Sequence, residues 1–265
     1  RTTVNDAFYT SPSIIKAIYK AVIRMGFRGG NILEPSMGIG NFYSAIPEEI
    51  EKNSNLYGVE IDDISGRIAK LLHPSANIQI CGFQDAQFDD NFFDLVIGNV
   101  PFGNFKINDP KYKKESFYIH DYFVVKALDK VAPGGIVALI TSKGTLDKAN
   151  SKFRRTIAEK AEMLGAIRLP NTAFKDSANT TVTSDILFFK KKRKAGIDIE
   201  EPNWLDLGKD YLTGISYNQY YFENPVMMLG EMVKDKSMFG ENSNYTGLRP
   251  FKAEDVNIDF DEMMD

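Results

Sequence analysis

The amino-acid sequence predicts an α/β fold built on one parallel sheet of seven strands. Short strand-like runs alternate with longer stretches of helical periodicity, and this alternation is typical of parallel sheets. Most of the runs are continuously apolar, as expected of strands that are buried on both faces. They cover residues 31–34, 56–60, 78–81, 95–99, 136–141, 164–169 and 186–190.

Helices are predicted before the first strand and between later ones. Ser11 and Pro12 form a helix-start signal, and apolar residues then recur at spacings of three and four. The same periodicity covers residues 63–72, 116–131 and 147–164. Between the last two of these stretches, Pro133-Gly134-Gly135 predicts a sharp turn into the fifth strand.

The composition changes after Phe189, where a basic run at 190–194 ends the last strand and a polar stretch begins. We therefore expect one domain at residues 1–194 and a C-terminal extension or linker at 195–265, which could lead to a further domain. The extension holds the only tryptophan, Trp204, a cluster of aromatic residues at 217–222 and an acidic end at 255–265. Its aromatic residues favour a packed extension over a disordered one.

The composition excludes several classes of protein. The chain has 265 residues, of which 43% are hydrophobic, so it can bury a core and is not a disordered protein. No apolar run approaches the roughly 20 residues that span a bilayer, and no signal-peptide pattern is present, so we expect a cytoplasmic protein with no membrane partner. Cys81, His73 and His120 are the only cysteine and histidines, and their spacing predicts no metal site.

The formal net charge is −4, so the chain lacks the excess of basic residues expected of a domain that binds nucleic acid by itself. The sequence also begins at Arg1 rather than methionine, which suggests a domain or fragment of a longer polypeptide.

A glycine-containing turn follows the first predicted strand. Glu34 and Pro35 end the strand, and Gly38 and Gly40 then let the backbone approach a ligand closely. A dinucleotide fingerprint would need a third glycine at Tyr43, so the nicotinamide interpretation is weakened.

An acidic residue ends the second predicted strand. Glu60 stands twenty positions after Gly40, where a carboxylate can accept hydrogen bonds from both ribose hydroxyls. The turn and the spaced acid together predict a site for a nucleoside-containing cofactor.

A second motif follows the fourth predicted strand, which runs into Asn99-Val100-Pro101-Phe102. Such a tetrapeptide can be a simple strand-ending turn. Its position favours a functional role, because the carboxyl ends of the strands are where open α/β sheets bind ligands.

These residues resemble the Asn-Pro-Pro-Tyr/Phe motif of S-adenosylmethionine-dependent N6-adenine DNA methyltransferases, with Val100 in place of the first proline. The sequence is most similar to methylase domains of phages and mobile elements, which are often fused to a helicase. Further segments that resemble this subgroup lie at 98–103, 119–123, 133–135, 140–145, 167–171 and 224–227. The resemblance implies a Rossmann-like, doubly wound methyltransferase domain at 1–194, with a mostly parallel seven-stranded sheet whose seventh strand is antiparallel, and a small C-terminal extension.

The resemblance implies S-adenosylmethionine as the cofactor. Tyr9 and Thr10 look like the segment that wraps its methionine end, Glu60 would contact the ribose, and Ile61 and Phe83 would enclose the adenine. The remaining implied cofactor residues are Glu34, Pro35, Gly38, Gly40, Asn41, Phe42 and Asn99. Gly82 departs from the family, which often has an acid there, so the group that contacts the cofactor's adenine amine stays open.

The resemblance also implies the chemistry. The side-chain oxygen of Asn99 and the backbone carbonyl of Val100 would accept hydrogen bonds from the target amine, and Pro101 would hold the turn. Phe102 would stack on an adenine that has been extruded from the duplex. Phe174 is either a second contact to the base or a packed loop residue.

Lysines near the motif are candidate phosphate contacts. Lys106 is the foremost, with Lys111, Lys113 and Lys114 beside it, although solvated lysines explain the same pattern. His120 and Asp121 are adjacent and so point to different faces of a helix, which favours a cap or core-edge role over a catalytic pair.

The predicted function is therefore N6-methylation of adenine in double-stranded DNA, as in restriction-modification. Methylation of RNA or of a protein glutamine is an alternative. A third possibility is a cofactor- or DNA-binding module that is inactive without a fused or associated helicase or target-recognition domain.

Overall fold

The computed structural model describes residues 9–174, 182–196, 200–234 and 245–251. Arg1 and the acidic end at 255–265, which the sequence analysis mentions, lie outside these ranges. All seven predicted strands are confirmed. They are β1 (Gly30–Glu34), β2 (Ser54–Glu60), β3 (Asn77–Ile80), β4 (Phe93–Asn99), β5 (Val131–Ser142), β6 (Ala161–Leu169) and β7 (Ser184–Lys191).

The seven strands form one sheet in the order β3-β2-β1-β4-β5-β7-β6. β1 pairs in parallel with β2 and β4, and β4 pairs in parallel with β5. β7 is antiparallel to both β5 and β6, so the predicted antiparallel seventh strand is confirmed. The paired part of β5 resumes at Ile136, after an irregularity at the predicted Pro-Gly-Gly turn.

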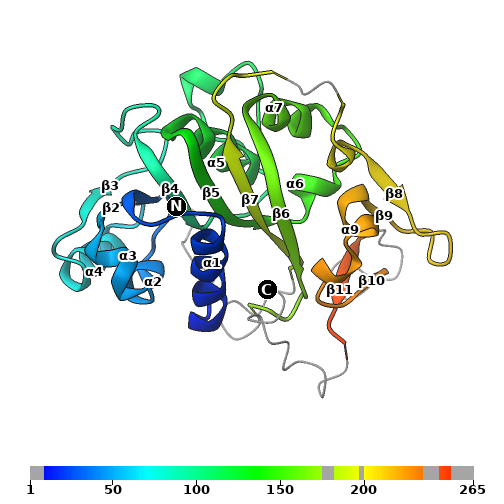
Figure 1. Ribbon diagram of the computed structural model, residues 1–265, viewed down its shortest axis with the longest axis horizontal. Helices are drawn as coiled ribbons and strands as arrows, with labels where there is room; N and C mark the ends of the chain where they lie inside the picture. Colours follow the sequence, from blue (N-terminus) through cyan, green and yellow to red (C-terminus); the bar gives the residue numbers. More distant parts are fainter. Residues whose placement is uncertain (1–8, 175–181, 197–199, 235–244, 252–265) are drawn as a thin grey trace.

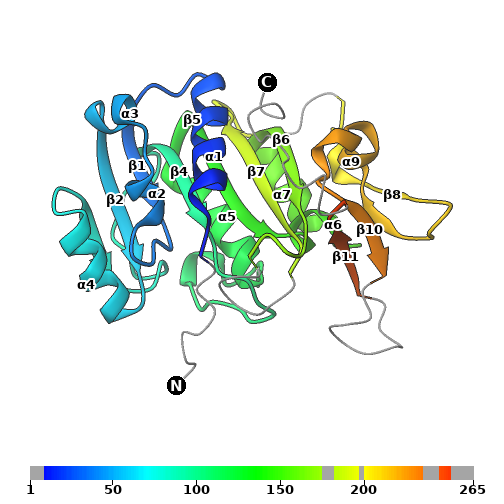
Figure 2. The ribbon, with the colours of Figure 1, turned by 90° about the horizontal axis from the view of Figure 1, so that it is seen from below.

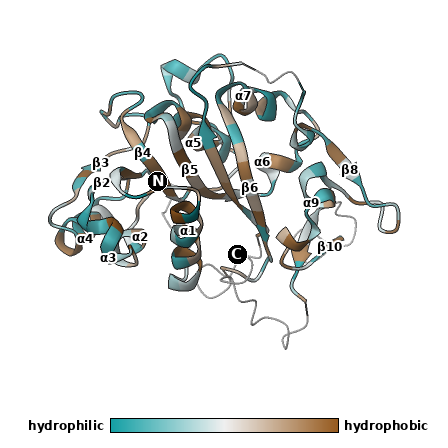
Figure 3. Ribbon diagram, viewed as in Figure 1, coloured by the Kyte–Doolittle hydropathy of each residue, from teal (hydrophilic) through white to brown (hydrophobic). Residues whose placement is uncertain are grey.

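Helices cover both faces of the sheet, as the doubly wound prediction requires. One apolar cluster joins the sheet to α1 (Pro12–Arg24), α2 (Asn41–Ser44), α3 (Glu48–Lys52) and α4 (Asp63–Leu72). The other joins the opposite face to α5 (Ile119–Lys130), α6 (Gly144–Asp147) and α7 (Lys152–Lys160). Figure 3 shows the apolar residues concentrated in the central strands.

Local signals explain where the longer helices begin. The Ser11 hydroxyl accepts a hydrogen bond from the Ile14 N–H (3.5 Å), and Pro12 occupies the first turn of α1. The Asp62 carboxylate accepts a hydrogen bond from the Ser65 N–H (2.8 Å) at the start of α4. Both caps use side chains that lie just before an apolar periodic stretch, so the predicted starts hold.

The predicted helix at 147–164 is wrong at both ends. Asp147 ends the short helix α6, and α7 covers only Lys152–Lys160. Ala161 already pairs with Lys191 in the sheet. The pairing of β6 along β7 satisfies backbone groups that a longer helix would have used, and tertiary context therefore overrides the helical periodicity.

The described part of the C-terminal extension packs beside β6, at the end of the sheet opposite β3, in both views (Figures 1 and 2). Trp204, Tyr217, Tyr221 and Leu248 belong to the same apolar cluster as β5 and β7. Its elements are η2 (Asn203–Leu205), β8 (Leu207–Lys209), β9 (Ser216–Asn218), α9 (Gln219–Glu223), η3 (Pro225–Met227), β10 (Glu231–Lys234) and β11 (Thr246–Arg249).

A buried arginine joins the extension to the sheet. Arg168 on β6 has no exposed surface, and its guanidinium donates two hydrogen bonds each to Asp147 and Asp185, at 2.8–2.9 Å. Its charged end also lies 4.4 Å from the ring centre of Tyr221 in α9. The Asn218 N–H of the extension donates to Asp147 (3.0 Å). One side chain therefore connects β6, β7, α6 and α9.

We expect Arg168→Met to lower the free energy of unfolding by about 3–5 kcal/mol, because two carboxylates would be left buried without a cation. Urea denaturation of the full chain measures this change. Arg155→Met is the matched control, since Arg155 pairs with Glu201 at the exposed surface, and it should change stability little. Equal effects of the two substitutions would contradict the structural role assigned to Arg168.

Candidate active site

The candidate site lies where three parallel strands end. Glu34, Glu60 and Asn99 are the last residues of β1, β2 and β4. The chain order reverses between β1 and β4, and open α/β sheets bind ligands at such a reversal. A Cβ added at Gly98 would lie 3.3 Å from the side chain of Glu34, so the ends of β1 and β4 are in close contact.

The carboxylate of Glu60 holds the glycine turn. One oxygen accepts a hydrogen bond from the Gly38 N–H (2.7 Å), and the other accepts from the Asp62 N–H (2.8 Å). The Met37 N–H donates to the Val59 carbonyl (2.9 Å), which joins the turn to β2. Each carboxylate oxygen keeps a second lone pair for a ligand hydroxyl.

The two glycines of the turn meet different constraints. Both have positive φ, 54° at Gly38 and 91° at Gly40, where other residues are strained. A Cβ at Gly40 would lie 2.5 Å from the ring of His73. A Cβ at Gly38 would meet nothing within 4 Å, so the backbone of Gly38 faces space that a ligand can enter.

Two buried polar atoms at this edge have no hydrogen-bond partner among the described residues, Glu34 Oε2 and Asn99 Oδ1. Burial, and secondarily the nearby Glu60, raises the pKa of Glu34 well above its usual range. The Asn99 Nδ2 donates to the Thr10 hydroxyl (3.2 Å), which leaves the Asn99 Oδ1 as an open acceptor. Unpartnered acceptors beside an open glycine fit a polar ligand at this edge.

The other predicted cofactor residues differ in their exposure. Tyr9 and Ile61 are exposed, and Pro35 and Asn41 lie in or beside the turn. Phe42 is buried in the core.

Phe83 is only 3% exposed, and its ring lies 5.1 Å from that of Phe123 in α5. The predicted adenine contact of Phe83 would use the small part of the ring that this packing leaves open.

The predicted catalytic turn is anchored to the sheet. The Val100 N–H donates to the Ile140 carbonyl (3.1 Å), and the Val100 side chain is buried in the core. Pro101 and Phe102 are half-buried, and Phe102 packs against both apolar clusters. The side chain at position 100 therefore points into packed protein, so valine can replace proline here without removing a group that faces the site.

The predicted DNA contacts are not all placed near this turn. Lys106 is exposed close to it and donates to the Ser116 hydroxyl (2.9 Å). Lys111 pairs with Asp90 and Asp129, which lie before β4 and at the end of α5, at the opposite edge of the sheet. Phe174 is buried in the core, and a base contact there would require the loop to move.

A buried polar cluster lies under the turn at the start of α5. The His120 ring lies near the backbone of Gly103 and beside Asp121, although neither ring nitrogen has a well-formed hydrogen bond among the described residues. Lys148 contacts the Asp121 carboxylate. Burial, and secondarily Lys148, lowers the pKa of His120 to about 4, whereas burial raises the pKa of Asp121 to about 6 despite Lys148. The core-edge position expected from the sequence agrees with this burial. The expectation that the two side chains point to different faces is wrong, because His120 Nε2 lies 3.6 Å from Asp121 Oδ1.

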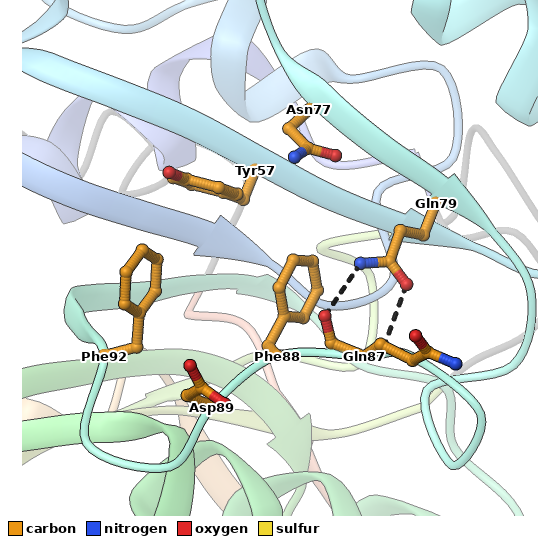
Figure 4. Close-up of a pocket in the computed structure, with 7 residues that line it drawn as sticks. All are labelled: Tyr57, Asn77, Gln79, Gln87, Phe88, Asp89 and Phe92. Atoms are coloured by element: carbon orange, nitrogen blue, oxygen red, sulfur yellow. Dashed lines mark hydrogen bonds between the residues drawn. The ribbon is translucent and has the colours of Figure 1, made fainter.

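Two cavities, of about 200 and 270 Å³, lie away from the strand-end edge. The smaller is lined by Tyr57, Phe88 and Phe92 together with polar side chains, and Gln79 closes one side through two hydrogen bonds to the backbone of Gln87 (Figure 4). Both are bounded by Asn77, the first residue of β3, so they open toward the edge opposite Asn99.

The described residues contain no group of three side chains suited to hold a metal ion. None of their helices is long and apolar enough to span a bilayer.

The strand order, the helices on both faces and the turn between β1 and α2 are those of the class I methyltransferase fold. A putative class I S-adenosylmethionine-dependent methyltransferase from Listeria monocytogenes superposes with a TM-score of 0.58 and 21% identity, over 76% of this chain and 65% of that one. Residues 3–210 match the family model described as N-6 DNA Methylase, and the chain belongs to this family.

Two curated relatives carry names connected with restriction. Defense against restriction protein B of Escherichia phage P1 is 35% identical over 190 residues, which are 69% of this chain and 8% of that protein. The Type I restriction enzyme MjaIX methylase subunit of Methanocaldococcus jannaschii is 23% identical over 219 residues, 70% of this chain and 37% of that subunit. The chain thus spans well under half of the length of either relative.

The opposed pKa shifts of His120 and Asp121 predict opposite effects of pH on stability. Between about pH 4 and its ordinary pKa of 6.5, His120 takes up a proton more readily in the unfolded chain, so this residue makes stability rise with pH. Between its ordinary pKa of 3.8 and about 6, Asp121 binds a proton more readily in the folded protein, so it makes stability fall with pH.

We therefore expect Asp121→Asn to expose the effect of His120. The difference in free energy of unfolding, variant minus unsubstituted protein, should increase by roughly 3 kcal/mol between pH 4 and pH 6. His120→Gln should change the slope in the opposite direction. Urea denaturation at a series of pH values measures both slopes, and parallel curves for all three proteins would contradict the assigned shifts.

Proposed function

We propose that this chain transfers the methyl group of S-adenosylmethionine to the N6 amine of adenine in double-stranded DNA. The N-6 DNA Methylase family supports DNA as the substrate, and the names of both relatives support a role connected with restriction-modification. The observation that carries the proposal is the orientation of the Asn99 carboxamide.

Asn99 presents an acceptor, and adenine N6 needs one. The amine shares its lone pair with the ring and is a poor nucleophile. An acceptor that binds one of its hydrogens favours tetrahedral geometry at nitrogen and frees the lone pair for attack. Because Thr10 accepts from the Asn99 Nδ2, the Oδ1 is left to serve as this acceptor. A buried acceptor without a partner costs about 1–3 kcal/mol, which a bound amine would recover.

The residues after Asn99 complete the base site in this proposal. The Val100 carbonyl is the second acceptor for the amine, and the Pro101 ring restricts the turn that presents it. Phe102 lies against the base after the adenine has left the duplex, where base–aromatic stacking contributes roughly 1–3 kcal/mol. No general base is assigned, since the methylated amine is a strong acid and releases its proton to water.

The turn and the strand ends would hold the cofactor. S-adenosylmethionine supplies a methyl group that is activated by attachment to a positively charged sulfur. Glu60 accepts hydrogen bonds from the ribose, Ile61 and Phe83 contact the adenine, and Gly38 lets the backbone approach. A cationic group near Glu34 would favour the ionised form of this carboxyl group and so offset the effect of burial on its pKa.

The decisive experiment offers the protein labelled S-adenosylmethionine together with methylation-free duplex DNA, RNA or a protein mixture. We expect label in duplex DNA, and N6-methyladenine after nuclease digestion and mass spectrometry. Label in RNA or in glutamine would identify one of the alternative substrates. Cofactor binding without turnover on any DNA would identify a module that needs a further domain or subunit. This outcome is worth testing because the chain covers only 8% and 37% of the two relatives.

We expect Asn99→Ala to lower kcat for DNA methylation by at least a hundredfold, because the side-chain acceptor for the amine is lost. The dissociation constant for the cofactor, measured by calorimetry, should change little. Asn55→Ala is the control, since Asn55 lies exposed at the start of β2 and hydrogen-bonds only Asn31 among the described side chains. Equal losses of cofactor affinity and kcat would show that Asn99 is structural.

Thr10 provides a separate test of the carboxamide orientation. Thr10→Val keeps the shape of the side chain but removes the acceptor for the Asn99 Nδ2, so we expect kcat to fall about 3- to 10-fold, the effect of one hydrogen bond. Thr10→Ser restores the hydroxyl and should restore kcat. The idea is wrong if valine and serine have the same kinetic effect.

A further inference from the structure

The loop between β4 and α5, residues 100–118, presents two exposed aromatic rings beside the candidate active site. Phe105 is 53% exposed and Tyr118 is 38% exposed. Large exposed aromatic side chains often mark binding surfaces, because their burial in a complex is strongly favourable. Neither residue was singled out from the sequence.

Backbone contacts hold the two rings on one platform. The Ile119 N–H donates to the Phe105 carbonyl (2.9 Å), and Lys106 forms an antiparallel bridge with Tyr118. A Cβ added at Gly103 would lie 2.6 Å from the Phe105 ring, so this ring covers the residue that follows Phe102. The platform is therefore continuous with the catalytic turn.

The buried polar cluster supports the platform from beneath. The Tyr118 ring stacks on the His120 ring, with centres 6.1 Å apart and planes 18° apart. The Lys148 ammonium lies 4.8 Å from the centre of the Tyr118 ring while it contacts Asp121. Tyr118 is thus held in place through packed contacts on one side, and its remaining surface faces solvent.

The charge around the platform suits nucleic acid. Residues 104–118 carry four lysines and two acids, although the whole chain has a net charge of −4. Asp109 is buried and paired with Lys126, and Lys111 pairs with acids at the opposite edge. Lys106 is the exposed charge that lies on the platform, with its ammonium 5.8 Å from the centre of the Tyr118 ring; Lys113, Lys114 and Glu115 are exposed further along the loop. Exposed rings beside lysines are the combination with which proteins bind bases and phosphates together.

We propose that Phe105 and Tyr118 stack on DNA bases next to the extruded adenine. This inference rests on the proposed function. Extrusion of a base leaves an unstacked gap in the duplex, and apolar or aromatic side chains can stabilise such a gap. Phe105 and Tyr118 lie on the platform that continues from Phe102, so their rings can fill this gap. Because packing already holds the rings in place, they lose little conformational freedom on binding.

The test measures methylation kinetics on a duplex that contains one mapped target adenine. Phe105→Leu and Tyr118→Leu keep apolar volume but remove the ring face, and Tyr118→Phe keeps the ring. Each leucine substitution should raise KM for duplex DNA about 5- to 100-fold, with the cofactor dissociation constant unchanged, and Tyr118→Phe should behave as the unsubstituted protein. Tyr211→Leu is the matched control, since Tyr211 is 94% exposed and lies between β8 and β9.

A second measurement reports base extrusion directly. With 2-aminopurine in place of the target adenine, the unsubstituted protein should raise the fluorescence of the duplex, and the double leucine variant should lose most of this rise. Unchanged KM and fluorescence in the leucine variants, or equal effects of Tyr118→Phe and Tyr118→Leu, would overturn the inference. If the unsubstituted protein methylates no DNA, the proposed function is wrong. If it methylates DNA and the leucine variants do so equally well, only the stacking proposal is wrong.

Discussion

The pairing of β1 with β2 on one side and β4 on the other is the constraint on which the site depends. Parallel strands end at the same edge, so this pairing brings together Glu34, Glu60 and Asn99, which are distant in sequence. Glu60 then holds the glycine turn at this edge by accepting a hydrogen bond from the Gly38 N–H. The strand order therefore brings together, in one arrangement, the residues proposed to hold the cofactor and those proposed to hold the base.

The Arg168 network performs the corresponding task at the other end of the sheet. β7 runs against its neighbours, and Arg168 near the end of β6 meets Asp185 near the start of β7 across one register pair. Asp147 brings α6 to the same guanidinium, and the extension adds Tyr221 and Asn218. Such buried charges often contribute specificity more than stability, since only one arrangement pairs all of them. We infer that they determine how the extension sits against the sheet.

Much of the fold could be predicted because strands buried on both faces leave continuous apolar runs, as in β4 and β5. The predicted helix at 147–164 failed because β6 pairing decides that segment, and pairing is not local. The positions of Asn99 and Glu60 at the ends of neighbouring strands could be predicted from motif and spacing. The Thr10 partner of Asn99 could not, since 89 positions separate them and only the packing of α1 brings them together. Lys111 looked like a neighbour of the turn, but its loop runs along α5 to the opposite edge.

The net charge of −4 argued against nucleic acid at first, but its distribution changes that argument. Glu34, Asp109, Asp121, Asp147 and Asp185 are all buried or nearly so, where they are paired with cations or have raised pKa values. An internal ion pair adds nothing to the net charge of −4 and little to the field outside, so the field that a phosphate meets depends on where the remaining charges lie. Lys106 lies on the loop that follows Asn99, with its ammonium 5.8 Å from the centre of the Tyr118 ring, so an acidic chain can still present a basic group beside exposed aromatic rings.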